Sequence, residues 1–344
     1  MKKNAILCIL GFLLLTASQC NAQTLIAVQN ESSSSFYDNL DSAIVHAVSG
    51  DFIYIPGGSF PITVPINKKL QIVGVGHNPD SCAVTGISQI AGSINIINGS
   101  DHGSISGLKI SGSVSFGTSP TEVSISYFSI ERCNIGGSLI LATQSSNILV
   151  NECIIQGLIN GNNTMGFQLS KCIIEGKEFE NPGVNGCVIQ NFNSNAYFIN
   201  NIFIGWKTSL WMVVNCHFRN NVFRSGPYNF GGNSLNLIQN NIFNGGETPG
   251  LYYIGQFINN IIGPLTDLFV NQSGYVYDYT QDYHIVATSP AHDAGTDGTD
   301  LGVYGTGSPW KEGSLPGNPH IQSKTFSKVN GNLNVEMKVA AQDY

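Results

Sequence analysis

The stretch YFINNIFIGW, residues 197–206, decides the fold, because two amides, Asn200 and Asn201, interrupt a run that otherwise has the composition of a buried strand. Burying an asparagine without hydrogen-bond partners costs about 1–3 kcal/mol, so this pair needs partners. The same pattern returns in HFRNNVFRSG, LIQNNIFNGG and QFINNIIGPL. The second asparagine of the four copies stands at 201, 221, 241 and 260, in steps of 20, 20 and 19 residues. A repeat of about 20 residues therefore organises this part of the chain.

Three earlier segments fit the same frame with cysteine in place of the second asparagine. They are SIERCNIGGS, LVNECIIQGL and QLSKCIIEGK, which place Cys133, Cys153 and Cys172 at this position. We call it the ladder position. In all seven units the third residue before it and the second residue after it are apolar. These residues are Ile130, Val150, Leu169, Phe198, Phe218, Ile238 and Phe257 before it, and Ile135, Ile155, Ile174, Phe203, Phe223, Phe243 and Ile262 after it.

The odd spacing between the two apolar positions indicates that the strand bends between them, with the ladder residue stacked at the inner edge of the bend. Each asparagine can then bond the backbone of its own turn and the amide one coil away. The residue before the ladder position is predicted to form an outward-facing column, because its charge alternates. It reads Arg132, Glu152, Lys171, Asn200, Asn220, Asn240 and Asn259. Short strands stacked through such columns predict an all-β solenoid with about 20 residues per coil.

The first residues have the layout of a secretory signal peptide. A basic start is followed by an apolar run from Ala5 to Leu15 and by a small residue at Ala22, and the run is too short to span a membrane. We expect cleavage after Ala22, which makes residues 1–22 the signal peptide. Lipid attachment at Cys20 is the alternative, although Gln19 is bulky where such sites place a small residue. The protein is thus expected to be exported to the periplasm, cell surface or medium.

The composition argues against nucleic acid and anionic membranes as partners. Without Lys2 and Lys3, thirteen basic residues remain against twenty-two acidic ones, a net charge of −9. Charged residues make up only 11% of the chain and glycine is frequent, at 39 residues, as expected for many short strands joined by tight turns. No later segment approaches 18 uninterrupted apolar residues, so no transmembrane segment is predicted.

The cysteines at the ladder position are predicted to be buried free thiols. On stacked strands, Cys133, Cys153 and Cys172 would lie about 4.8 Å apart with parallel side chains, which is unfavourable for disulfide geometry. Small apolar side chains of this kind suit a buried column.

The N-terminal part of the expected mature chain resembles a known family. FYDNLDSAIVHAVSGDFIYIPGGSF predicts a short helix near residues 36–48, with Phe36, Leu40, Ala43, Ile44 and Ala47 on one face, and then a strand. This segment looks like the opening of right-handed parallel β-helix proteins of the pectin lyase-like superfamily, in which such a helix caps the solenoid. INKKLQIVGVG and GSISGLKISGS fit the early coils of that family.

The end of the repeat region supports the same resemblance. DYHIVATSPAHDAGTDGTDLGVYG is similar to the closing segment of secreted β-helix proteins from polysaccharide-degrading Gram-negative bacteria. The resemblance spans about residues 36–306 and implies a right-handed parallel β-helix, and we expect this domain to comprise residues 23–312. It specifies fold and secretion but no chemistry.

Residues 313–344 are predicted to form a terminal hairpin. Leu333, Val335, Met337 and Val339 alternate with polar residues, and Asn330-Gly331 is a two-residue turn signal. We expect this hairpin to cover the last coil and protect its sheet edge.

The catalytic residues of the acid-polysaccharide enzymes that share this fold are not recognisable. Residues 123–263 contain no aspartate, and SDHGS at 100–104 has the composition of a polar turn. Inverting hydrolysis needs two carboxyl groups about 6.5–9.5 Å apart, and Glu152 and Glu175 belong to different columns. A lyase would need a base, for which Lys177, Lys207 and Arg224 are candidates.

One candidate metal site stands near the C-terminal end of the repeats. Asp293, Asp297 and Asp300 stand among glycine and threonine and could hold calcium, although tight turns use the same residues. His217, His284 and His292 lack metal-ligand spacing. No other cofactor is predicted.

A row of loops is the candidate substrate surface. Loops of variable length follow four successive units, and EGKEFENPGVNG is inserted in the longest. They carry aromatic and charged residues, as a sugar-binding groove does, although Trp206 and Tyr228 could instead pack on the coil below. The residues are Lys177, Glu178 and Glu180, then Trp206 and Lys207, then Arg224 and Tyr228, then Glu247, Tyr252 and Tyr253.

Three functions remain open at the level of the sequence. The leading hypothesis is an exported β-helix protein that binds or modifies an extracellular polysaccharide or oligosaccharide. A non-catalytic surface or assembly scaffold is the first alternative, since solenoids present extended binding surfaces. A lyase for uronate-containing chains with a lysine or arginine base is the second.

Overall fold

The structure is a computed structural model that describes residues 25–119, 123–175, 187–193, 195–205, 208–224, 235–245, 254–311, 315, 317, 320–329 and 332–340. The predicted signal peptide and Cys20 lie outside these residues. Within the described residues, no helix is long and apolar enough to cross a membrane.

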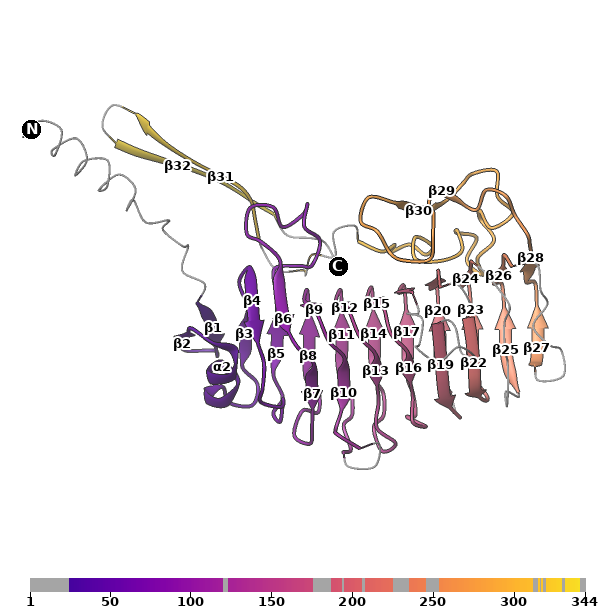
Figure 1. Cartoon of the computed structure of the whole chain (residues 1–344), viewed down its shortest axis with the longest axis horizontal. Coiled ribbons are helices and arrows are strands. Elements are labelled where there is room, and N and C mark those ends of the chain that lie inside the picture. Colours follow the sequence, from indigo (N-terminus) through magenta and orange to yellow (C-terminus); the bar gives the residue numbers. More distant parts are fainter. Residues whose placement is uncertain are drawn as a thin grey trace, which may run out of the picture.

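The protein is all-β. Most of its strands belong to three long sheets, and in each sheet the strands stack one after another along a common axis (Figure 1). Sheet A consists of β2 (Ser34–Tyr37), β1 (Ile26–Gln29), β3 (Phe52–Tyr54), β5 (Gln71–Val73), β8 (Ser104–Ser106), β11 (Ser129–Glu131), β14 (Leu149–Asn151), β17 (Gln168–Ser170), β20 (Tyr197–Ile199), β23 (His217–Arg219), β25 (Asn236–Gln239) and β27 (Ile254–Ile258). Sheet B consists of β4 (Gly58–Pro61), β6 (Ser88–Ala91), β9 (Lys109–Ile110), β12 (Asn134–Ile135), β15 (Ile154–Ile155), β18 (Ile173–Ile174), β21 (Ile202–Phe203), β24 (Val222–Phe223), β26 (Ile242–Phe243) and β28 (Ile261–Ile262). Sheet C consists of β7 (Ile94–Ile96), β10 (Val114–Phe116), β13 (Leu139–Ile140), β16 (Ile159–Asn160), β19 (Cys187–Phe192) and β22 (Thr208–Val213).

The strands pair in parallel throughout sheets B and C and in sheet A from β3 onward, so the architecture is compatible with a β-helix. Only the first strand, β1, pairs antiparallel with both of its neighbours, β2 and β3. The register aligns the predicted apolar column, since Ile130 pairs with Val150 and Val150 with Leu169.

The ladder position forms a continuous chain of hydrogen bonds, as predicted. The backbone nitrogen of Asn221 donates to Oδ1 of Asn241 (2.9 Å), and that of Asn201 to Oδ1 of Asn221 (2.9 Å). The Asn221 amide also donates to the Phe198 oxygen one coil earlier (2.7 Å). The cysteines continue the chain, because the backbone nitrogen of Cys153 lies 3.3 Å from Sγ of Cys172. This network satisfies the amides whose burial the repeat requires.

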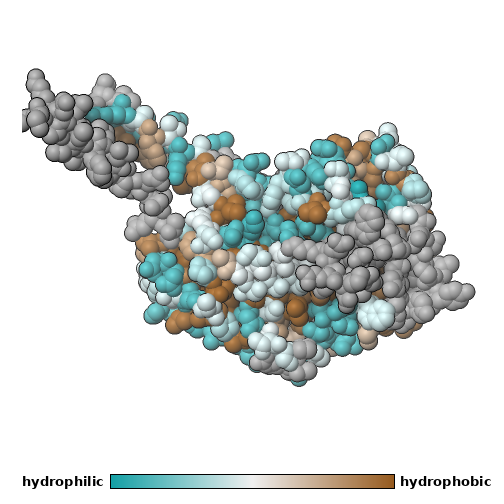
Figure 2. All heavy atoms as spheres, in the orientation of Figure 1, coloured by the Kyte–Doolittle hydropathy of each residue, from teal (hydrophilic) through white to brown (hydrophobic). Residues whose placement is uncertain are grey.

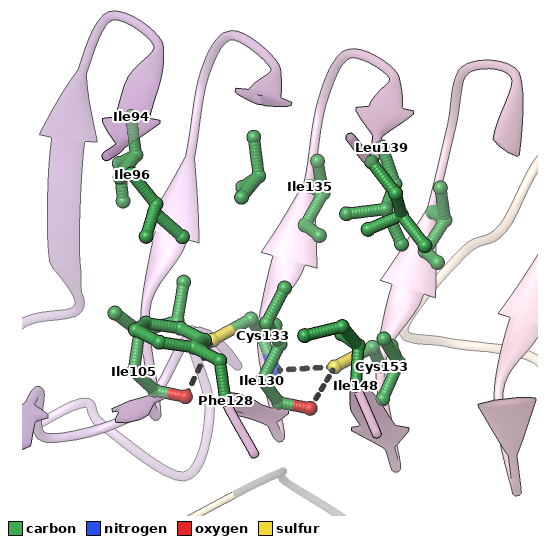
Figure 3. Close-up of a cluster of buried hydrophobic side chains, with 14 of the residues drawn as sticks. Ile94, Ile96, Ile105, Phe128, Ile130, Cys133, Ile135, Leu139, Ile148 and Cys153 are labelled. Carbon is green, nitrogen blue, oxygen red and sulfur yellow. Dashed lines mark hydrogen bonds between the residues drawn. The ribbon is translucent and has the colours of Figure 1, made fainter. Parts of the chain in front are cut away.

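The first hydrophobic core fills the space between the three sheets (Figure 3). Both predicted apolar columns belong to it over most of their length, and Phe198 stacks on Phe218 with ring centroids 4.5 Å apart. Cys133, Cys153 and Cys172 are buried and free, which confirms the predicted thiol column. Burial raises the pKa of the Cys133 and Cys153 thiols well above the ordinary value.

The predicted N-terminal helix is present but shorter than residues 36–48. Helix α2 (Leu40–His46) begins at Asn39, whose side chain accepts a hydrogen bond from the Ser42 nitrogen (2.8 Å). Leu40, Ala43 and Ile44 are buried as expected. The placement of Phe36 on this face is wrong, because Phe36 belongs to β2 and is 63% exposed.

The column before the ladder position bends the chain, and four of its seven side chains are buried. All seven residues have a left-handed backbone, with φ between 50° and 57°, which forms the turn from sheet A to sheet B. Arg132, Glu152, Asn200 and Asn220 are nevertheless buried. The column thus points out of the solenoid, as predicted, but these four side chains do not reach solvent. A later part of the chain, residues 264–311, covers it, and we call this part the closing segment.

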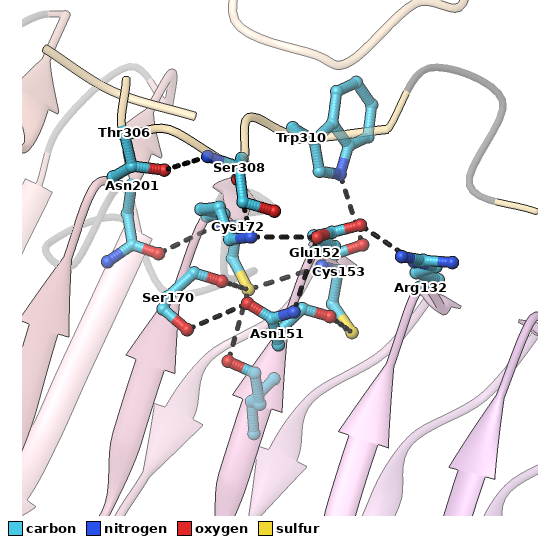
Figure 4. Close-up of polar contacts among 12 residues, drawn as sticks. Arg132, Asn151, Glu152, Cys153, Ser170, Cys172, Asn201, Thr306, Ser308 and Trp310 are labelled. Carbon is cyan, nitrogen blue, oxygen red and sulfur yellow. Dashed lines mark hydrogen bonds and ion pairs between the residues drawn. The ribbon is translucent and has the colours of Figure 1, made fainter. Parts of the chain in front are cut away.

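Main-chain and side-chain bonds hold the closing segment against the turns (Figure 4). Nζ of Lys171 donates to the Ser308 oxygen (2.9 Å), and the Gly302 nitrogen donates to the Asn220 oxygen (2.8 Å). Just beyond the segment, the Arg132 guanidinium donates to the Leu315 oxygen (2.8 Å). The closing segment itself contains the small antiparallel pair β29 (Phe269–Asn271) and β30 (Asp282–Ile285).

A second hydrophobic core lies between the closing segment and the outer face of sheet B. The residue after the ladder position points outward there, as Ile154, Ile173, Ile202, Val222 and Ile242 do, and all five are fully buried. They pack with residues of the closing segment, which are Leu268, Tyr283, Ile285, Ala291, Leu301, Val303 and Trp310. Several strands of sheet B are thus buried on both faces.

The closing segment also reaches the early coils through Tyr279. Its hydroxyl donates to the His77 oxygen (3.1 Å), lies 2.8 Å from Nδ1 of His77, and accepts from the Asn134 amide (2.9 Å). Burial, together with the charge of Lys109, lowers the pKa of His77 to about 3.

The predicted C-terminal hairpin is present as β31 (His320–Val329) and β32 (Asn332–Ala340), which pair antiparallel. Its turn, Asn330-Gly331, lies outside the described residues. The hairpin does not cover the last coil. It lies toward the β4 end of the molecule, far from β28, and its described side chains from 323 to 328 and from 332 to 339 are exposed (Figure 1).

Candidate ligand-binding face

The outer face of sheet C carries a row of aligned side chains, one from each strand. Their register is continuous from Asn95 through Ser115, Ile140, Asn160 and Gln190 to Trp211. We call these six residues the sheet C row. Each points away from the core because its neighbours Ile94, Val114, Leu139, Ile159, Ile189 and Leu210 point inward and are buried. Six strands at about 4.8 Å give the row a length of roughly 24 Å.

The row has unused hydrogen-bonding groups. Among the described residues, the side chains of Ser115, Gln190 and Trp211 make no hydrogen bond within the protein. Oδ1 of Asn160 is already occupied, because it accepts from the Asn191 amide (3.0 Å) and from the Asn162 nitrogen (3.1 Å). These bonds fix the Asn160 amide with its Nδ2 donor available. Such groups can bind hydroxyls without first breaking internal bonds.

A pocket of about 290 Å³ lies at the β7 end of the row. Asn95, Ser115 and Ile140 line it together with the turn at residues 117–119. Oδ1 of Asn95 is buried there without a partner, which leaves an acceptor for a donor from a ligand or a water molecule. No charged side chain lines the pocket.

Trp211 forms the other end of the row and is 48% exposed. An exposed indole offers a flat apolar surface and one N–H donor, which together suit the apolar face and hydroxyl edge of a sugar ring. Met212, the next residue in β22, is also exposed, and its backbone is left-handed (φ 52°). The row therefore combines polar groups with one aromatic platform and contains no charge.

Most residues of the predicted loop surface lie outside the described residues. These are Lys177, Glu178, Glu180, Trp206, Lys207, Tyr228, Glu247, Tyr252 and Tyr253. Arg224 is described. Its Nε donates to Oε1 of Gln272, and its guanidinium lies 4.8 Å from the Tyr275 ring centre. Arg224 thus binds the closing segment, and of the predicted loop residues it alone can be placed.

The two glutamates considered for hydrolysis have structural partners. The Glu152 carboxylate accepts from Nε of Arg132 (2.8 Å) and from Nζ of Lys171 (3.0 Å). Glu175 accepts from the Tyr277 nitrogen (3.0 Å), and both glutamates are buried under the closing segment. Their positions leave them without access to a polymer in solution.

The aspartates considered for calcium divide into two groups. Asp293 and Asp300 lie with His292 in a cluster whose ligand atoms are all within 4.8 Å. Sequence spacing did not reveal that His292 belongs there. Asp297 instead accepts from its neighbour Thr299 (2.7 Å). Two carboxylates and an imidazole supply fewer oxygens than the six to eight that calcium takes.

These observations define an all-β protein of stacked parallel sheets with an uncharged, partly exposed row along one sheet. Comparison with known proteins finds no match: no family model, no curated protein and no solved structure is significantly similar to the chain.

The sheet C row was missed at the level of the sequence, although a signal was present. In SLILAT, GLINGN, CVIQNF and SLWMVV, a buried leucine or isoleucine precedes Ile140, Asn160, Gln190 and Trp211. These four segments contain four of the sheet C strands. Aligning the repeat units on them, in addition to the ladder position, would have placed Trp211 in a column.

Proposed function

We propose that the protein is an exported right-handed parallel β-helix protein of the pectin lyase-like type that binds a neutral extracellular polysaccharide along the sheet C row. The observation that carries the proposal is the row itself, in which Ser115, Asn160 and Gln190 present unused polar groups and Trp211 presents an exposed indole. A polymer of sugars matches a repeating array better than a small ligand does, because each strand repeats the contact at a fixed step.

The absence of charge in the described row favours a neutral polymer. Binding a uronate chain calls for guanidinium or ammonium groups, and Arg224, the one loop candidate that can be placed, is bound to Gln272 and Tyr275. The net charge of the chain, −7, also opposes a polyanion.

The test is affinity electrophoresis and calorimetry of the full chain against a panel of neutral and acidic polysaccharides. We expect binding to neutral polymers, and a loss of about tenfold in affinity for Trp211→Ala, which corresponds to about 1.4 kcal/mol. Tyr127→Ala is the matched control, because Tyr127 is an exposed aromatic residue (57%) outside the row. Unsaturated-product absorbance and reducing ends, recorded on the same panel, report turnover.

Unchanged affinity of a polymer that binds the wild type, in the double variant Trp211→Ala/Gln190→Ala, would reject the row as the binding site. Binding of acidic polymers alone would reject the neutral substrate class.

A further inference from the structure

The C-terminal hairpin exposes an amphipathic sheet that has no partner among the described residues. The strands β31 and β32 pair only with each other. Five large apolar residues of the pair are exposed, from 44% for Val335 to 71% for Leu333. Figure 2 shows some of this apolar surface on the arm that stands off the body of the molecule. An isolated two-stranded hairpin is marginally stable in water, so its apolar face calls for a surface that covers it.

The register separates the two faces of the hairpin. One face carries the opposed pairs Phe326–Val335, Lys324–Met337 and Lys328–Leu333. The other face carries Thr325–Glu336, Ser327–Asn334 and Ser323–Lys338. One side is therefore apolar with two lysines, and we call it the basic–apolar face. The opposite side is polar.

A surface of complementary character lies at the far end of the molecule. There β27 and β28 are the last strands of sheets A and B, and their outer edges have no strand partner among the described residues. Ile258 and Ile262 are 37% and 38% exposed at this end, and Asp267 is exposed five residues after β28. Unpaired strand edges with apolar side chains are templates for further pairing.

The hairpin is basic, and the segment that follows the uncharged strands β27 and β28 is acidic. The hairpin, residues 320–340, has three lysines and one glutamate, a net charge of +2. The closing segment, which follows β28, has six aspartates and one lysine, a net charge of −5. The hairpin is thus a basic region on an acidic protein, and the exposed Asp267 is the acidic residue that follows the open strand edges most closely in sequence.

We propose that the basic–apolar face of the hairpin docks on the last coil, at β27 and β28, of a second copy of this chain. The hairpin and the last coil lie at opposite ends of the same molecule, so the contact is made between copies (Figure 1). Because the two surfaces differ, the contact is heterologous and leaves one hairpin and one last coil free at the ends of each assembly. Copies therefore add head to tail.

The proposal is tested by sedimentation velocity and light scattering of the full chain over a concentration series. We expect the mass to rise beyond that of a dimer as concentration increases, and to fall as salt is added. The hairpin variant Phe326→Asp/Val335→Asp and the end variant Ile258→Lys/Ile262→Lys should each stay monomeric. The matched control is Ser327→Asp/Asn334→Asp, which adds the same charge to the polar face and should assemble like the wild type.

Mixing the two monomeric variants gives the decisive result. The hairpin variant keeps an intact last coil and the end variant keeps an intact hairpin, so the mixture should form a one-to-one dimer that grows no further. Circular dichroism of each variant checks that it is folded. A wild type that stays monomeric throughout would overturn the proposal, as would an oligomer that the end variant still forms, which is the result expected for two-fold pairing of hairpins. Binding of the wild-type monomer to lipid vesicles would assign the hairpin to a membrane surface instead.

Discussion

The indole nitrogen of Trp310 donates a hydrogen bond to the backbone oxygen of Glu152, which lies 158 residues earlier in the chain (3.3 Å). The carboxylate of the same Glu152 joins Arg132 and Lys171, one coil before it and one coil after it (Figure 4). One residue therefore connects three successive coils to the closing segment. This connection explains how a column of charged residues can be buried without leaving charges unpaired.

Removing the charge of Glu152 should destabilise the protein strongly. Glu152→Gln keeps the size of the side chain but leaves Arg132 and Lys171 without a counter-ion, and we expect a loss of about 3 kcal/mol in the free energy of unfolding. The measurement is chemical denaturation. Glu131→Gln, one coil earlier on a partly exposed residue, is the control and should cost less than about 0.5 kcal/mol. A triple replacement of Arg132, Glu152 and Lys171 by apolar residues should cost less than Glu152→Gln alone, and the opposite order would contradict this account.

Interrupting the amide ladder should cost more than interrupting the column beside it. The Asn221 side chain accepts from two groups of Asn201 and donates to Phe198 and Asn241. The Asn200 side chain has two longer bonds, since it donates to the Gly302 oxygen (3.2 Å) and accepts from the Asn220 amide (3.5 Å). We expect Asn221→Leu to lower the free energy of unfolding by about 1–3 kcal/mol, and Asn200→Leu by less. Both positions are buried, so the comparison depends on hydrogen bonds and not on exposure. Equal losses would show that the ladder adds nothing beyond ordinary burial.

The thiols at the ladder position should be unreactive in the folded protein. Cys133, Cys153 and Cys172 are buried, and burial raises the pKa of the first two, which suppresses the reactive thiolate. A thiol reagent should label them only after denaturation, and non-reducing digestion should release no paired peptides. A disulfide among the three, detected by mass spectrometry, would contradict the observed packing.

Acid should destabilise the contact between Tyr279 and the early coils. Burial lowers the pKa of His77 from 6.5 to about 3, so the unfolded chain binds a proton in this range and the folded chain does not. The contribution of His77 is full above pH 6.5 and is lost as the pH falls toward 3. His77→Asn, which keeps a donor near Tyr279, should reduce the pH dependence of unfolding by up to about 1.4 kcal/mol per pH unit. His102→Asn, at an exposed position, should leave it unchanged, and equal slopes in all three proteins would reject the assignment.

Much of the inner architecture could be predicted because it depends on neighbouring coils alone. The repeat of Ile130, Cys133 and Ile135 contains the strand, the bend and the ladder within six residues, and identical side chains one coil away complete each contact. Helix α2 was predictable for the same reason, since its capping residue and apolar face are local.

The outer layer could not be predicted from the repeat, because its contacts join parts of the chain far apart in sequence. Arg132 and Glu152 have the charge expected of solvent-facing residues, and nothing near them in sequence indicates that Leu315 and Trp310 cover them. A partial signal was present in the paired apolar residues of Ile154-Ile155, Ile173-Ile174 and Ile202-Phe203. Ile155, Ile174 and Phe203 face the first hydrophobic core. The residue before each of them points outward and can be buried only by a second hydrophobic core.

The candidate site, the sheet C row, was not predicted from the sequence. An aromatic residue beside the loops was expected at Trp206, whereas the described aromatic residue on the sheet is Trp211, five residues later. The difference arises because loop composition marks polar and aromatic content but not direction. On a strand, alternate side chains point to opposite faces, so the direction of Trp211 follows from the alignment of the sheet C strands.

The closing segment also imposes an order on the folding of the chain. A solenoid in which each coil contacts only its neighbours can fold progressively as the chain is made, starting from the N-terminus. Here the outward residues Ile154, Ile173 and Ile202 stay uncovered until residues 264–311 have been synthesised. The emerging chain therefore carries an apolar stripe on a partly folded rod, and chaperones have a defined surface to bind until the closing segment is released.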